Sequence, residues 1–374
     1  MRFVHTADWQ VGMKAAHVGE AGARVREVRL EAARRVVKAA QEFSADFILV
    51  AGDTFEDNGV DHVYIQKVAD ILGLFDGHVY LLPGNHDPLV PGSVWDHPSW
   101  QSQANLLVLG EPAPVEIEGG WLYPCPLLEK YSGKDPTSWI DADKAEGIRI
   151  GVAHGSVEGI DPEDHYHPIP RNAADRSGLD YLALGHWHSY ASYETGGAIR
   201  MAYSGTHEPT RFGERDSGQV LLVEIGGSKE PPSIKPEKTG VLEWLALDEE
   251  ATLEGDIARI RQKIEALEKP SDMLVLLTVS GIFHFEESDE LPRLDEIIES
   301  RFLYGRTDAS GLHPVPDDAE LLSTVPAGVV REAASRLLEL SDPAYSGDRP
   351  ELGSPDVASR ALLELYAMAR EVGR

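Results

Sequence analysis

Five short segments place metal-seeking side chains directly after apolar runs, in a fixed order along the chain. Apolar runs that alternate with helical patterns are typical of buried strands in a layered α/β domain. In such sheets, ligand sites collect in the loops beyond the carboxyl ends of the strands. We therefore expect these distant loops to meet at one edge and to bring together Asp8 in HTADWQ, Asp53 in AGDTFED, Asn85 and His86 in PGNHD, His154 in VAHGS, and His186 and His188 in GHWH.

The same patterns predict the division of the chain. Residues 1–225 alternate strand-like and helix-like patterns, which predicts a first domain of the α/β class. The stretch GGSKEPPSIKPEKTG (226–240) is rich in Gly, Pro and charge and predicts a linker. Residues 241–315 read as strand, helix, strand and helix, which predicts a small α+β domain. Residues 316–374 carry two helical patterns, 329–340 and 355–372. Strands are predicted at 3–4, 47–51, 79–82, 148–153, 181–184 and 220–225, and helices at 25–40 and 63–74.

Composition limits the setting of the protein. The single cysteine, Cys125, excludes an internal disulfide framework and fits a reducing cytoplasm. The chain opens on a short strand pattern rather than a signal peptide, and no apolar stretch approaches the roughly 20 residues of a membrane helix. We therefore expect a cytoplasmic protein without a membrane partner.

The net charge of −29 argues against long-range attraction to nucleic acid. An acidic chain could still bind nucleic acid in three ways. Metal ions could neutralise an acidic centre, a basic groove could be local, or a partner subunit could supply the contacts. The alternative is that acidity only keeps the protein soluble or reflects life at high salt. Composition alone favours that alternative.

Each metal-seeking motif is weak by itself. Asp8 fits a turn or a helix cap, and Gly52–Asp53 and Asn85–His86 both fit turns. Their joint occurrence, each after an apolar run, indicates a metal site instead. Carboxylate, amide and imidazole ligands suit two divalent cations. Two cations about 4 Å apart can clamp a phosphate ester and activate water to attack it. The pattern therefore predicts a metal-dependent phosphoesterase, and we favour a nuclease.

The motif order D-x-Q, GDxxE, GNHD, H and GHxH resembles the calcineurin-like metallophosphoesterase superfamily, which usually shows D-x-H, GDxxD, GNH[DE], H and GHxH. Within it, HTADWQVG (5–12) and SGTHEPTRFGE (204–214) are similar to segments of SbcD-type DNA exonucleases, the nuclease subunit of the double-strand-break repair complex. The resemblance covers residues 1–225. It implies a layered β-sandwich flanked by helices, a small α+β capping domain and C-terminal helices.

The resemblance also implies roles for the candidate residues. One cation would take Asp8, Gln10, Asp53 and His188; the other would take Asp53, Asn85, His154 and His186, with Asp53 as the bridge. His86 would face the phosphate and stabilise charge or protonate the leaving oxygen. Glu56 would orient His86. The implied ions are two Mn²⁺, with Mg²⁺ as the alternative.

Two positions depart from the family pattern. Gln10 stands where most relatives have histidine, and a neutral amide oxygen is a poorer ligand for transition metals than imidazole. We therefore expect the first metal site to be the weaker one. His207 could be a compensating ligand, but we favour a position at the surface or behind the ligands. Glu56 is one methylene longer than the usual aspartate.

Substrate and partners follow from the same resemblance. Lys14, Arg211 and Phe212 are the candidates for contacts with DNA; Trp9 and Trp187 are either stacking platforms or core walls. An SMC-like ATPase of the SbcC type is the expected partner, with docking on helix 355–372, which fits packing on its own core equally well. A homodimer is a further expectation. The alternatives are a small-molecule nucleotide or pyrophosphate phosphoesterase and a non-catalytic scaffold with a weakened metal site.

Overall fold

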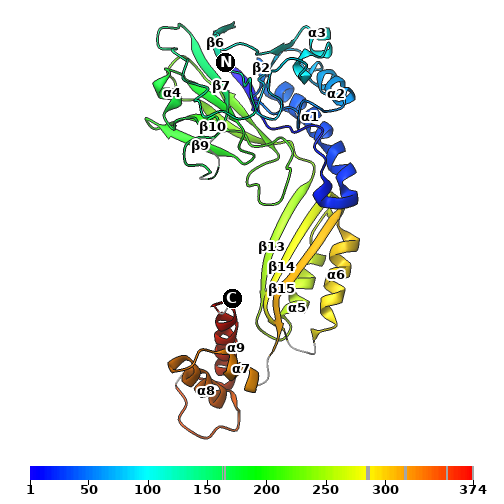
Figure 1. The fold of residues 1–374 in the computed structure, drawn as a ribbon, viewed down its shortest axis with the longest axis vertical. Coiled ribbons are helices and arrows are strands. Elements are labelled where there is room, and N and C mark those ends of the chain that lie inside the picture. Colours follow the sequence, from blue (N-terminus) through cyan, green and yellow to red (C-terminus); the bar gives the residue numbers. More distant parts are fainter. Residues whose placement is uncertain (162, 164–165, 284–286, 316–317, 351–352, 373–374) are drawn as a thin grey trace. The chain divides into compact units, whose positions relative to one another are not determined.

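The computed structural model describes residues 1–374 apart from 162, 164–165, 284–286, 316–317, 351–352 and 373–374. The described residues form two compact units, Met1–Glu243 and Trp244–Arg374 (Figure 1). The predicted boundary at residue 316 lies outside the described residues. Within the described part of the chain, no helix is both long and apolar enough to cross a membrane.

Two six-stranded sheets make up the first unit. The first sheet has the order β12-β11-β1-β2-β3-β4, and the second has the order β5-β6-β7-β8-β10-β9. The first sheet contains β1 (Arg2–Thr6), β2 (Phe47–Val50), β3 (His78–Leu81), β4 (Leu106–Val108), β11 (Gln219–Glu224) and β12 (Ser233–Lys238). The second contains β5 (Val115–Ile117), β6 (Gly120–Cys125), β7 (Ile148–His154), β8 (Tyr181–Gly185), β9 (Ala191–Thr195) and β10 (Ala198–Tyr203). The helices are η1 (Ala16–Ala21), α1 (Gly22–Phe43), α2 (His62–Leu72), η2 (Val94–Asp96), α3 (Ser99–Ser102) and α4 (Ala173–Arg176).

Side chains of β2 show how these layers form. Ile48 and Val50 pack in a core with residues of α1 and α2, whereas Phe47 and Leu49 pack in a second core with residues of the other sheet. The strand is therefore buried on both faces, which explains its unbroken apolar run. A third core covers the outer face of the second sheet. The predicted α/β sandwich flanked by helices is confirmed.

The strand order brings the motif loops to one edge. Strands β1, β2 and β3 run parallel, as do β6, β7 and β8. Asp8 and Asp53 follow β1 and β2, His154 ends β7, and His186 follows β8. Since carboxyl ends of parallel strands share an edge, residues up to 178 positions apart can meet there.

The prediction of a linker over residues 226–240 is wrong for the second half of this stretch. Residues 233–238 form β12, which pairs antiparallel with β11 at the edge of the first sheet. The edge position explains the misleading composition. An edge strand tolerates Pro236, and its charged side chains can remain exposed to solvent.

The second unit contains a three-stranded sheet in the order β13-β14-β15. Its strands are β13 (Glu243–Ala251), β14 (Met273–Phe283) and β15 (Tyr304–Pro314), and its first helices are α5 (Asp256–Glu265), η3 (Pro270–Asp272) and α6 (Glu290–Arg301). Apolar residues of α5 and α6 pack with those of β14. Strand β15 was not predicted, because YGRTDASGLHP has too few apolar residues to show a pattern.

Three helices complete the second unit: α7 (Asp318–Thr324), α8 (Val329–Ser341) and α9 (Pro355–Val372). Leu362 and Tyr366 of α9 are buried in a cluster with Val325. This is the self-packing that the sequence left open. Val357 and Met368 remain 54% exposed, and docking of a partner on α9 stays a prediction.

His5 connects the two sheets of the first unit and makes stability depend on pH. Its buried ring accepts from the Tyr181 hydroxyl through Nδ1 (3.0 Å) and donates from Nε2 to the Leu184 carbonyl (3.1 Å). Burial lowers the pKa of His5 to about 3. As the pH falls below 6.5, His5 becomes protonated in the unfolded chain but stays neutral in the folded chain. The folded state therefore loses stability between pH 6.5 and about 3.

Replacing His5 by glutamine should remove this acid sensitivity. Between pH 7.5 and pH 4.5, the free energy of unfolding should fall by about 2–3 kcal/mol more in the wild type than in His5→Gln. Chemical denaturation of both proteins at the two pH values measures this difference. Parallel decreases in the two proteins would contradict the assignment.

Candidate metal centre

Ligand atoms from loops of both sheets meet at one point. Buried Asp8, Asp53 and His154 place one ligand atom each within 4.8 Å of one another. Asn85 Oδ1 lies 2.8 Å from His154 Nε2 and 3.1 Å from His186 Nδ1. Five of the seven predicted ligands are thus in one cluster.

The arrangement around His154 requires a positive charge. Its Nδ1 lies 2.9 Å from the Ala51 carbonyl oxygen, so Nδ1 carries a proton and donates. The other nitrogen, Nε2, faces Asn85 Oδ1 at 2.8 Å and Asp53 Oδ2 at 3.4 Å. If the His154 ring were neutral, the lone pair of Nε2 would face these two oxygens, and no hydrogen would lie between the nitrogen and either oxygen. A divalent cation among these donors satisfies all three, so the donor set fits a metal.

The ionisation of the cluster agrees with this interpretation. Burial alone would raise the pKa of Asp53, but the charge and hydrogen bond of His154 outweigh it and hold this pKa well below its usual range. Burial alone would lower the pKa of His154, whereas Asp53 and Asp8 raise it to about 9. Burial also raises the pKa of Asp8. Without a metal, His154 therefore holds the proton that a cation would displace.

The backbone at the site is held in an uncommon conformation. Four predicted ligands have φ in the left-handed region: Asp8 (54°), Gln10 (48°), Asp53 (52°) and His186 (109°). Such conformations cost energy in non-glycine residues and cluster at functional sites. Hydrogen bonds between the loops maintain them: the His186 N–H donates to both Asp8 carboxylate oxygens (3.0 and 3.1 Å), and the Asp8 N–H donates to the Gly52 carbonyl.

Three glycines let the ligands close against the backbone. A Cβ on Gly52 would lie 2.2 Å from His154 Nδ1, and one on Gly84 would lie 2.2 Å from Asp53 Oδ1. A Cβ on Gly185 would lie 1.9 Å from the Ala51 carbonyl oxygen. A side chain at any of these positions would displace a ligand or its partner.

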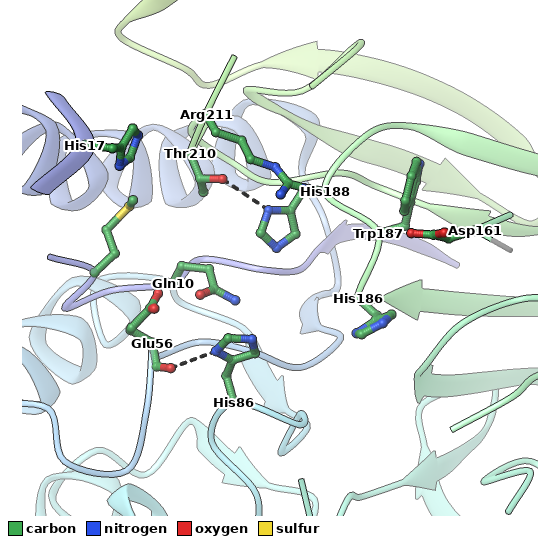
Figure 2. A pocket seen from close by; sticks show the side chains of 11 residues that line it. Gln10, His17, Glu56, His86, Asp161, His186, Trp187, His188, Thr210 and Arg211 are labelled. Carbon is green, nitrogen blue, oxygen red and sulfur yellow. Dashed lines mark hydrogen bonds between the residues drawn. The ribbon is translucent and has the colours of Figure 1, made fainter. Parts of the chain in front are cut away.

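Gln10 and His188 occupy the other side of the cluster. The Gln10 amide nitrogen donates to Asp53 Oδ2 at 3.1 Å, so the amide reaches the predicted bridging carboxylate. To bind a cation there, it must present its oxygen instead. The weaker first site therefore stays a prediction. Figure 2 shows Gln10, His86, His186 and His188 directed toward the same cavity.

His86 stands beside the cluster rather than in it. Its N–H donates to Asp53 Oδ1 (2.9 Å), and its Nδ1 donates to the backbone carbonyl of Glu56 (2.8 Å). Glu56 therefore contacts His86 through its backbone carbonyl, and an orienting role for Glu56 stays a prediction. The carboxylate lines the cavity, where burial raises its pKa.

The cavity has a volume of about 550 Å³ and extends from the metal cluster to exposed side chains. Of the predicted DNA contacts, only Arg211 lines it. Lys14 lines an adjoining hollow, and Phe212 lines a shallow one that it shares with Trp187 and Arg211. The lining residues of the main cavity are Gln10, Met13, His17, Glu56, His86, Asp161, His186, Trp187, His188, Thr210 and Arg211.

Trp9 and His207 belong to the core. Trp9 is fully buried, donates from Nε1 to Thr6 Oγ1 and stacks on the His207 ring at 4.7 Å between centroids. Trp9 is therefore a core wall rather than a base-stacking platform. His207 is also buried and donates from Nε2 to the Arg29 carbonyl. It stands behind the ligands.

Comparison with known proteins assigns the chain to a family. A family model described as calcineurin-like phosphoesterase matches residues 1–190, about half of the chain. The chain belongs to this family. It is a metallophosphoesterase with a candidate metal site at Asp8, Asp53 and His154.

Individual relatives are more distant. The chain is 28% identical to the uncharacterized metallophosphoesterase YhaO of Bacillus subtilis (strain 168) in an alignment of 204 positions that covers 50% of this chain and 48% of YhaO. It therefore spans about half the length of this curated relative. The crystal structure of TT1561 of Thermus thermophilus is 9% identical, with a TM-score of 0.43 over 64% of this chain and 98% of the other. That of calcineurin-like phosphoesterase YfkN from Bacillus subtilis is 12% identical, with a TM-score of 0.36 over 64% of this chain and 90% of the other.

Arg29 is a residue of this phosphoesterase site that the sequence did not reveal. It lies on α1, is fully buried, and donates to the carbonyl oxygens of Trp9 (2.7 Å) and Glu208 (3.0 Å), and more weakly to that of Asp8 (3.4 Å). Burial lowers its pKa to about 10, so it remains charged at neutral pH. One guanidinium thus joins α1, the Asp8 loop and the segment 204–214.

Glu214 is a second such residue. Its carboxylate is buried, accepts from the Thr210 N–H (2.8 Å) and hydroxyl, and lies 2.9 Å from His188 Nδ1. Burial by itself raises the pKa of Glu214, but the hydrogen bonds from His188 and Thr210 outweigh it and lower that pKa. The carboxylate keeps the proton of His188 on Nδ1 and leaves Nε2 free as a ligand. A 26-residue separation in sequence concealed this pair.

Replacing Glu214 by glutamine should weaken the predicted metal site that contains His188. Loss of a carboxylate that orients a ligating histidine typically lowers metal affinity about 10–100-fold. Titration calorimetry of chelator-treated protein with Mn²⁺ would measure both sites. Asp161→Asn is the matched control, because it removes a carboxylate that lines the same cavity and that accepts from the Glu163 N–H. Equal weakening by both variants would indicate a general charge effect instead.

Proposed function

We propose that this metallophosphoesterase is a two-metal phosphodiesterase that cleaves DNA. The observation that carries the proposal is the convergence of carboxylate, amide and imidazole donors from loops of both sheets on one cavity, with His86 beside them. Two Mn²⁺ ions, or Mg²⁺ as the alternative, would stabilise the phosphate charge and activate the attacking water.

The protein's own residues would position these ions and move the proton. Asp53 would bridge both sites, and its carboxylate accepts a hydrogen bond from the His86 N–H. Because His86 Nδ1 donates to the Glu56 carbonyl, Nε2 is the atom that can serve the substrate. When doubly protonated, His86 would donate the Nε2 proton to the leaving oxygen or stabilise the charge that develops there.

The segment 204–214 supports DNA as the substrate. It is the segment that is similar to SbcD-type nucleases, and its Thr210 and Arg211 line the cavity. The Arg211 side chain is 70% exposed and lies 3.9 Å from the Glu214 carboxylate, so a backbone phosphate can reach it. In a chain of net charge −29, a cation at the site supports local attraction of phosphate.

A comparison of substrates across a Mn²⁺ titration tests the proposal. The full chain should cleave end-labelled duplex DNA as well as bis(p-nitrophenyl) phosphate, with Asp53→Asn as the control for contaminating nucleases. Turnover of nucleotides or pyrophosphates without DNA cleavage would favour the small-molecule phosphoesterase. Binding of Mn²⁺ without hydrolysis of any ester would favour the scaffold.

A further inference from the structure

Two loops of the second sheet reach the same edge as the metal cluster. One follows β6 and the other follows β7, and the register pairs Cys125 with Ala153 and His154 with Gly185. The ends of β6, β7 and β8 therefore lie side by side. Because β6 is hydrogen-bonded to β7, the backbone just beyond β6 begins about 5 Å from the backbone at the end of β7.

Backbone hydrogen bonds connect these loops to the metal loops. The Leu127 N–H donates to the carbonyl of Pro83, two residues before Asn85 (3.2 Å). The His167 N–H donates to the Ser132 carbonyl (2.7 Å), and the Ser156 N–H donates to the His167 carbonyl (3.2 Å), two residues after the ligand His154. The segments 127–132 and 166–167 are therefore bonded to the metal loops, outside the side chains that line the 550 Å³ cavity, and we call these two segments the rim.

This rim exposes aromatic and apolar side chains. Tyr131 is 56% exposed and Tyr166 is 49% exposed; their ring centroids are 4.6 Å apart and their planes are inclined by 49°, so each ring offers a base its own face. Leu128 beside them is 58% exposed. The Lys130 ammonium lies 5.6 Å from the Tyr131 ring centroid. A gathering of exposed apolar side chains beside a reactive site indicates a ligand surface.

The chemistry of this rim fits a nucleobase. The face of a tyrosine ring stacks on any base, and the flanking ammonium suits the backbone phosphate. A base next to the scissile phosphate must leave its own stack to reach such a ring, so it must be unpaired. We propose that Tyr131 and Tyr166 form a stacking platform for an unpaired base at a DNA end. This inference rests on the proposed nuclease function and specifies its substrate.

Steady-state kinetics of the full chain with Tyr131→Ala and Tyr166→Ala test the platform. The KM for labelled duplex DNA with a single-stranded end should rise about 5- to 150-fold for each lost ring, as expected for loss of one base stack. The kcat for bis(p-nitrophenyl) phosphate should stay unchanged, because the proposed platform holds a base and does not touch the reacting atoms. Tyr131→Phe keeps the ring and should retain the wild-type KM for DNA.

A matched control is Leu74→Ala, which removes an apolar side chain that is 63% exposed but lies before β3, at the opposite end of the strands. Unchanged KM for DNA in both alanine variants, with the wild type cleaving DNA, would overturn the platform alone. Equal loss on DNA and on the small diester would overturn it as well, since it would indicate damage to the metal centre. If the wild type hydrolyses the diester but not DNA, the proposed nuclease function itself fails.

Discussion

Asp53→Asn is expected to lower hydrolysis by about 10³-fold or more and to abolish tight binding of both metals. Asp53 contributes the negative charge that both predicted sites share, and loss of a main electrostatic element of an active site has effects of this order. Asparagine has nearly the same shape and can still accept from the His86 N–H. The defect should therefore come from charge rather than from folding.

Three measurements separate these effects. Calorimetric titration with Mn²⁺ should show the loss of metal binding, and cleavage assays should show the loss of rate. In metal-free protein, the pKa of His154 should fall, because Asp53 is the group that raises it most. Asp57→Asn is the matched control: Asp57 lies in the same loop but is exposed, and it accepts from the Gly59 N–H. Wild-type affinity for two Mn²⁺ in Asp53→Asn would contradict the predicted bridge.

His86→Asn is expected to lower kcat for DNA by about 10²–10⁴-fold, the usual contribution of a general acid, while both metals still bind. The ring donates to the Glu56 carbonyl, and His86 reaches the predicted ligand Asp53 through its backbone N–H. Asparagine keeps that N–H. Metal affinity should therefore stay within about threefold of the wild type, as expected for a change outside the ligand set.

The leaving group distinguishes a proton donor from a structural residue. Bis(p-nitrophenyl) phosphate releases a phenolate that needs little protonation, so His86→Asn should reduce its turnover much less than it reduces cleavage of DNA. His78→Asn serves as the matched control, since His78 is exposed at the amino end of β3, whereas His86 follows its carboxyl end. Equal losses on both substrates would show that His86 does not act as the acid.

The first domain and its candidate ligands could be predicted because their pattern is local. Each motif follows a strand that is buried on both faces, so the apolar runs were visible without any knowledge of packing. The edge strands β12 and β15 were missed for the opposite reason. Neither strand shows a continuous apolar run. Each forms because it pairs with another strand, β12 with β11 and β15 with β14, and a local sequence pattern does not show this pairing.

The roles of residues that act through contacts with other side chains or carbonyls were harder to predict from the sequence. Glu56 occupies the expected position, yet its backbone carbonyl makes the contact with His86, which any residue type could provide. Glu214 and Arg29 were missed because their partners, His188 and the carbonyls of two separate loops, come together only after both sheets have formed.

Residue types and strand patterns are properties of short segments, so they were enough to indicate which side chains could serve as ligands and in what order they follow the strands. The packed fold was needed to show which nitrogen of His154 donates to the Ala51 carbonyl, which glycines must lack a side chain, and which carboxylate contacts His188. Those features depend on distances between atoms of loops more than a hundred residues apart, and such distances exist only once the two sheets have packed together.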